Sequence, residues 1–280
     1  MLTHLLPCCV VLCAVLGFSH GAMAQTYYEY MRCDDAVVKI VGDHFKLDNF
    51  AYPEYGSDKK ETIVAGECKP WPTDKSRMIA AFANDAGVAY EEPGSTERKI
   101  QIFLALVDTE KKQVIASYET TVEEDALIYF SEYSLRLDTA RYILSKTDRA
   151  FALRMGVNRC GCAYDGCWDD ELTLFVISGK KLRPILSQTM QHQWQSGATC
   201  GGEGEITVIG ASTFIAIENT TTNGFANLRL SVASNAKKKP PNRVIKYNGK
   251  EYDLVQWNKA FNDWWEVVYE QEMVRPQVKP

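Results

Sequence analysis

The sequence predicts an all-β fold. Short runs with alternating apolar and polar residues recur along most of the chain, and turn-forming residues separate them. The predicted hairpins repeat about every 30 residues, which favours a propeller-like arrangement over a sandwich, although the pattern fits both. A C-terminal segment has helical spacing, and an even number of cysteines follows an N-terminal apolar segment. The sequence therefore predicts a multi-hairpin, disulfide-stapled β fold with a C-terminal helix.

Residues 1–24 have the pattern of a cleavable signal peptide. Leu5–Phe18 is an apolar run too short for a stable membrane span, and Ala22-Met23-Ala24 places small residues before Gln25. The alternative is an N-terminal core helix, which would normally show a polar face. We therefore expect export to the periplasm or, as a second choice, secretion. No later apolar stretch is long enough to form a transmembrane segment.

Three hairpins are predicted between residues 99 and 186, each made of two alternating runs around a polar turn. Their strands are Lys99–Val107 with Gln113–Tyr118, Arg141–Ser145 with Ala150–Met155, and Glu171–Ile177 with Leu182–Leu186.

The strand pattern continues through Glu205–Ile209, Thr213–Ile217 and Leu228–Val232. It ends in a hairpin around Asn248-Gly249, a strong two-residue turn signal. Asp74–Asn84 is ambiguous, because it suits a short helix and its central part suits a buried strand equally well. We expect residues 25–257 to form a single β-rich domain.

Residues 258–273 are predicted to form a helix that packs on this domain. Its apolar positions follow helical spacing: Phe261, Trp264, Trp265, Val268 and Tyr269. Trp264 and Trp265 are adjacent and cannot both point straight into the core. We expect one to anchor the helix and the other to stay partly exposed as a candidate partner contact. Residues 274–280 are expected to be a disordered tail.

Six cysteines follow the signal segment, and an oxidising compartment favours disulfides between them: Cys33, Cys68, Cys160, Cys162, Cys167 and Cys200. The positions of the cysteines in the sequence favour a disulfide between Cys33 and Cys68. Cys162 and Cys167 flank an Asp-Gly turn signal, which suits a disulfide between them. Cys160 and Cys200 would then form the third disulfide, and other pairings stay open. A zinc site made of the last four sulfurs is the alternative, but their spacing is not a standard zinc motif.

Two segments contain oxygen ligands that calcium prefers. Asp165, Asp169, Asp170 and Glu171 are close together, but they lack the alternating spacing of a calcium loop, so a solvated loop is the favoured interpretation.

Asn219–Leu228 resembles the calcium loop of FG-GAP and VCBS propeller blades. The ligand positions would be Asn219, Thr221, Asn223 and Asn227, with Gly224 at the glycine position. No ligand is a carboxylate, so calcium would bind weakly, and an Asn-Gly β-turn explains the segment almost as well.

A wider resemblance is to a poorly characterised family of exported bacterial proteins. It is carried by Cys68–Pro72 with Met78–Phe82 and by Leu137–Tyr142 with Arg149–Arg154. The resemblance implies a place in a Gram-negative envelope and no particular chemistry.

No catalytic motif is found in the sequence. His192 with Ser196 or Cys200 could form a base and a nucleophile, but neither G-x-S-x-G nor H-E-x-x-H occurs. We therefore expect His192 to lie in a polar loop, and we expect no catalytic residue and no cofactor.

The net charge of −5 is spread over a mixed surface, which argues against nucleic acid. Lys237–Pro241 is basic but is expected to be a solvated turn. A rigid β frame with loops rich in Tyr and Trp favours a non-catalytic binding protein, for example an inhibitor- or immunity-like partner of another envelope or secreted protein. The alternatives are a periplasmic hydrolase that uses the His192 region and a calcium-dependent structural module.

Overall fold

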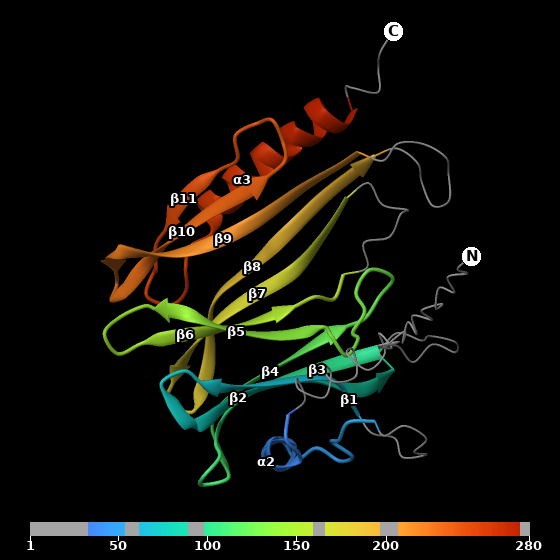
Figure 1. Cartoon of the computed structure of the whole chain (residues 1–280), viewed down its shortest axis with the longest axis vertical. Coiled ribbons are helices and arrows are strands. Elements are labelled where there is room, and N and C mark those ends of the chain that lie inside the picture. Colours follow the sequence, from blue (N-terminus) through green and yellow to red (C-terminus); the bar gives the residue numbers. More distant parts are fainter. Residues whose placement is uncertain (1–32, 54–61, 89–97, 159–165, 197–206, 275–280) are drawn as a thin grey trace, which may run out of the picture. The chain divides into compact units, whose positions relative to one another are not determined.

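The computed structural model describes residues 33–53, 62–88, 98–158, 166–196 and 207–274 (Figure 1). The predicted signal peptide, half of the expected disulfide cysteines and the tail after residue 274 lie outside these ranges. In the described part, no helix is long and apolar enough to cross a membrane.

The described residues are mostly β, as predicted, and their strands belong to one eleven-stranded sheet. The strands are β1 Ile63–Trp71, β2 Asp74–Val88, β3 Arg98–Asp108, β4 Gln113–Glu123, β5 Leu135–Ile143, β6 Arg149–Met155, β7 Gly166–Ser178, β8 Lys181–Ser196, β9 Thr207–Thr222, β10 Phe225–Ser234 and β11 Asn242–Ile245. The helices are α2 Asp35–Phe45 and α3 Val255–Val268, and a π-helical segment, η1 Tyr269–Val274, follows α3.

The three hairpins predicted between residues 99 and 186 are the pairs β3–β4, β5–β6 and β7–β8. The ambiguous segment 74–84 is part of strand β2, because its central residues are buried on both sides. The two strands expected within residues 205–217 form the single strand β9, whose first part pairs with β8 and whose later part pairs with β10.

The sheet curls so that its two ends meet. Its main path runs β1-β2-β3-β4-β8-β7-β6-β5, and the parallel contact between β4 and β8 is a single pair, Ser117 with Lys181. The end strands β1 and β5 are joined by side chains: the Glu67 carboxylate accepts from the Leu137 N–H, and Lys69 Nζ donates to the Leu137 carbonyl at 2.6 Å. The strands of this path therefore surround one apolar cluster, and the single sheet is not divided into propeller blades.

The long apolar run of β3 is explained by the burial of both its faces. Ile102 and Leu104 point into the cluster inside the curled sheet, whereas Ala105 packs against the valines of α2 and Phe103 contacts Phe45 of α2. Helix α2 was not expected from the sequence. The Cys33–Cys68 disulfide, with a Cα–Cα distance of 5.1 Å, ties the residues just before α2 to strand β1.

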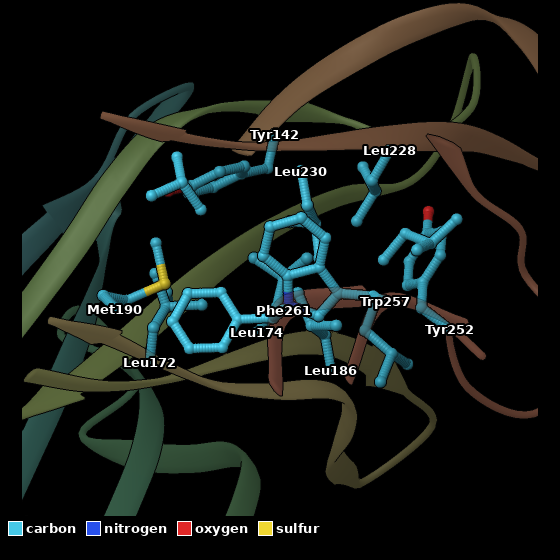
Figure 2. Packing of buried hydrophobic residues seen from close by; sticks show 14 of the residues in the cluster. Tyr142, Leu172, Leu174, Leu186, Met190, Leu228, Leu230, Tyr252, Trp257 and Phe261 are labelled. Carbon is cyan, nitrogen blue, oxygen red and sulfur yellow. The ribbon is translucent and has the colours of Figure 1, made fainter. Parts of the chain in front are cut away.

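A second large cluster covers the other face of strands β5–β8, and α3 supplies its buried tryptophan and phenylalanine side chains (Figure 2). The helix begins at Val255, three residues earlier than predicted, and so includes Trp257, which is completely buried among Leu174, Leu186 and their neighbours. The predicted C-terminal helix is therefore present, and its aromatic side chains are buried.

One of Trp264 and Trp265 was expected to stay partly exposed, but both are buried. Only 5% of the Trp264 surface and 8% of the Trp265 surface are accessible. Trp265 stacks on Trp194 of β8 with ring centroids 5.8 Å apart. Trp264 donates its Nε1–H to the Lys238 carbonyl at 3.1 Å. Both rings are therefore covered by parts of the chain that are distant in sequence, so helical spacing alone could not predict their burial.

Candidate functional site

An open cleft of about 800 Å³ lies between strands β5 and β9, and we call it the β5–β9 cleft. Strands β6, β7 and β8 also contribute to its lining. Its main polar side chains are Lys69, Arg136, Asp138, Tyr142, Arg154, Asp170 and Thr213.

Strand register explains why polar groups gather here. Arg136 of β5 is opposite Arg154 of β6, and Asp138 is opposite Ala152. Directly opposed residues of an antiparallel pair share a face, and Ala152 belongs to the cluster under α3. Arg136, Asp138 and Arg154 therefore lie on the same sheet face as the apolar cluster under α3 and extend that face into the cleft.

A bulge in β5 brings Tyr142 close to Asp138. Asp138 and Tyr142 are four residues apart on β5, but their partners on β6, Ala152 and Ala150, are only two apart. The extra residues bend the strand. As a result, the Tyr142 hydroxyl donates to Asp138 Oδ2 at 3.0 Å.

Arg154 is the centre of the ion-pair network at the cleft. Its Nε is 3.1 Å from Asp138 Oδ2 and its Nη1 is 2.5 Å from Asp170 Oδ2. All three side chains are largely shielded, with 18%, 21% and 12% of their surfaces exposed respectively. Asp170 has a positive φ of 58°, a conformation that carries a modest cost for a non-glycine residue. Two arginines hold it there, because Arg136 Nη2 also lies 3.2 Å from its Oδ1.

The network keeps Asp138 and Arg154 charged. Burial pushes the pKa of Asp138 upward, but hydrogen bonds from the Ala140 N–H and Arg154 outweigh burial, so the pKa is lowered overall. Burial also opposes the charge of Arg154, yet the charge of Asp170 and the hydrogen bond to Asp138 raise its pKa. Burial and the nearby charge of Asp138 raise the pKa of Tyr142 to about 12. At neutral pH the cleft therefore contains a fixed arginine–carboxylate network.

The Arg136 guanidinium of the cleft remains available to a ligand. Arg136 is 58% exposed at its side chain, and its only hydrogen bond within the described ranges goes to Asp170. A guanidinium has five N–H donors, so most of them are unused. Thr213 is 96% buried, yet its hydroxyl has no hydrogen-bond partner among the described residues. The unused guanidinium donors of Arg136 suit a negatively charged oxygen group.

His192 lies in strand β8 and not in the polar loop expected from the sequence. Its ring packs against Phe261 and Trp265, with centroid distances of 4.5 and 6.2 Å. Burial lowers its pKa to about 4, and its Nδ1 has no partner in the part of the chain that the structure describes. Ser196 lies four residues further along the same strand, about 13 Å away at the usual rise of a strand, so the two cannot hydrogen-bond. Cys200 lies outside the described residues.

The acidic run around β7 does not converge on one point. Asp170 binds the two arginines, whereas Glu171 accepts a hydrogen bond from the Thr189 hydroxyl at 2.8 Å. Asp169 has a weak contact of 3.5 Å with the Asn158 N–H, and Asp165 is outside the described ranges. Successive side chains of a strand point to opposite faces, so these carboxylates are separated.

The segment that resembles a calcium loop forms the tight turn between β9 and β10. Asn223 and Gly224 have φ angles of 50° and 89°, which fits a two-residue type I′ hairpin turn. The Asn223 side-chain amide donates to the Tyr247 carbonyl and that of Asn227 to the Thr220 hydroxyl, both at 2.9 Å. The geometry favours the Asn-Gly turn as the explanation. The described residues contain no cluster of three or more His, Cys, Asp or Glu side chains arranged for a metal.

Of the six expected disulfide cysteines, Cys33, Cys68 and Cys167 are described. Cys167 is disulfide-bonded, and its partner lies outside the described residues because Cys33 and Cys68 bind each other. The pairings proposed for Cys162–Cys167 and Cys160–Cys200 stay predictions.

No protein-family model, curated protein or solved structure matches the chain. Sequence reasoning overlooked the β5–β9 cleft, although one signal was present: Arg154 lies in the predicted strand Ala150–Met155, on the face that carries Ala150 and Ala152. A charged residue on a buried face usually has a specific partner.

Proposed function

We propose that the protein is a non-catalytic binding protein of the periplasm that recognises an acidic segment of another envelope or secreted protein in the β5–β9 cleft. The observation that carries this proposal is the position of Arg136, exposed and with unused donors, next to the rigid Arg154–Asp170 pair. Arginine suits carboxylate recognition because its planar donors match two carboxylate oxygens.

An exposed aromatic side chain supports a protein partner. Phe214 lines the same cleft and is 55% exposed. Exposed aromatic rings next to arginine are enriched at the centres of protein interfaces. The cleft therefore offers an apolar contact and a charged contact side by side.

The titration behaviour of the cleft favours binding over acid–base catalysis. A general acid or base works best when its pKa lies near the working pH. The lowered pKa of Asp138 and the pKa of about 12 for Tyr142 both lie far from neutrality. These groups would keep one charge state while a partner binds.

The test compares Arg136→Glu with the matched control Lys111→Glu, which makes the same charge change in the turn between β3 and β4. Lys111 and Arg136 are both exposed, so neither substitution should unfold the protein. In pull-downs from envelope extract, the wild type and the control should retain a stoichiometric partner. Arg136→Glu should retain at least tenfold less, because a hydrogen bond between charged groups is worth about 1.5–3 kcal/mol. Equal retention by both variants would disprove the proposal.

A further inference from the structure

A second groove, separate from the β5–β9 cleft, lies between residues 238–243 and α3. It encloses about 640 Å³, and we call it the basic groove. Its charged lining residues are Lys238, Lys239, Arg243, Lys259 and Asp263.

The charge of this groove is opposite to that of the whole chain. Four cations and one carboxylate line it, a net charge of +3, whereas the chain has a net charge of −5. Asp263 neutralises only Lys259, with Nζ and Oδ2 2.8 Å apart. Lys238, Lys239 and Arg243 form no ion pair within the described residues. Like charges held close together repel one another, and a bound anion would relieve that repulsion.

The backbone that carries these lysines is fixed to the C-terminal helical segment. The Lys238 carbonyl accepts from Trp264 Nε1, and the Glu272 carboxylate accepts from the backbone N–H groups of Lys237 and Lys238 at 2.9 and 3.3 Å. The Glu272 carboxylate is therefore bound to backbone groups. Pro240 and Pro241 restrict the chain that follows. The lysine side chains thus project from a backbone whose position is already determined.

We propose that the basic groove binds a phosphate-bearing ligand. A phosphoryl group has up to two negative charges and several acceptor oxygens, which suits several ammonium groups better than the single charge of a carboxylate would. Lysine binds phosphate as a point charge without strict geometry. Binding of a long nucleic acid would need a basic stripe across the surface, whereas these cations are confined to one groove. The phosphoryl group could belong to a soluble compound or to a lipid headgroup.

Two binding assays with the full mature chain separate these sources. Isothermal titration calorimetry with inorganic pyrophosphate tests whether the groove binds a soluble ligand. Flotation with vesicles that contain phosphatidylglycerol, compared with phosphatidylcholine vesicles, tests an anionic membrane surface. Binding in either assay should weaken as salt is added, since exposed charges are screened.

The decisive variant is Lys238→Gln/Lys239→Gln. Its matched control is Lys246→Gln/Lys250→Gln, which removes two exposed lysines outside the lining of the groove. Loss of two nearby lysines should weaken binding roughly tenfold or more, while the control should bind like the wild type. Thermal melts of both variants show whether each is folded.

Binding in one or both assays that only the groove variant loses would support the proposal and identify the source. Absence of binding in both assays, or equal loss in the groove variant and the control, would overturn it. Arg136→Glu should bind phosphate normally, so the result does not depend on the function proposed for the β5–β9 cleft.

Discussion

Replacing Trp257 by alanine should destabilise the fold strongly, because this side chain joins α3 to the sheet. Its ring is completely buried. A buried tryptophan removes about 150–250 Å² from water, which at about 25 cal/mol per Å² corresponds to about 4–6 kcal/mol. The Trp257 Nε1–H has no partner in the described part of the chain, so its burial already costs about 1–3 kcal/mol. The difference between the two is a net loss of about 1–5 kcal/mol, with about 3 kcal/mol as the central value.

The same reasoning predicts a contrast with phenylalanine. Trp257→Phe keeps most of the apolar ring and removes the unpaired N–H, so its unfolding free energy should stay within about 1.5 kcal/mol of the wild type. Val255→Ala is the control, since Val255 belongs to the same helix and is 69% exposed. Urea unfolding of the three variants gives the free energies. If Trp257→Ala unfolds like the control, α3 is not docked and the reasoning is refuted.

Three other sites provide separate tests. Cys33→Ala/Cys68→Ala should lower the unfolding free energy by about 4 kcal/mol, because the disulfide spans 35 residues; an unchanged urea midpoint would contradict this. Burial lowers the pKa of His192 to about 4, so the unfolded chain takes up this proton first as the pH falls. The unfolding free energy should therefore fall by about 3 kcal/mol between pH 6.5 and 4, and His192→Phe should lack this part of the pH dependence. Thr213→Val should leave stability unchanged or higher, because it removes a buried unpaired hydroxyl; a calorimetric loss above about 1 kcal/mol would show that the hydroxyl is bonded.

The hairpins could be predicted from sequence because their signals are local. The turn at Asp108–Lys112 is made of polar residues and is closed by a local hydrogen bond, in which Asp108 accepts from the Lys111 N–H at 2.8 Å. The strands on each side, β3 and β4, alternate or are continuously apolar, as buried strands are. Local turn chemistry and periodicity therefore determine both the position and the partner of these strands.

Helix α2 was missed because its local signals are weak. It has only eleven residues, and Asp34, at its N-cap position, makes no side-chain capping bond. Its three buried valines, Val37, Val38 and Val41, are β-branched residues that also suit a strand. The helix is stabilised chiefly by packing on β2 and β3 and by the adjacent disulfide, and both are non-local.

The binding regions could not be found from sequence for a related reason. Arg136 and Asp170 are 34 residues apart, and Trp264 and Lys238 are 26 apart. Only the curled sheet and the docked helix bring these pairs into contact. The residue types were visible in the sequence, but their distances depend on tertiary structure.

The ion-pair network of the β5–β9 cleft gives a last test that separates stability from recognition. Removing one partner of a shielded network leaves charges unpaired, whereas replacing all partners by neutral groups is often tolerated. Arg154→Met alone leaves Asp138 and Asp170 without their main partner, and we expect a loss of about 2–3 kcal/mol, since these groups are still partly exposed.

The triple variant Arg154→Met/Asp138→Asn/Asp170→Asn should recover most of that loss, because asparagine also tolerates the positive φ of Asp170. If the network serves binding, the triple variant should be nearly as stable as the wild type in urea and yet retain much less partner in pull-downs. A triple variant that is stable and still binds its partner fully would show that the network has no part in recognition. A triple variant as unstable as Arg154→Met would show that the ion pairs themselves hold β5, β6 and β7 together.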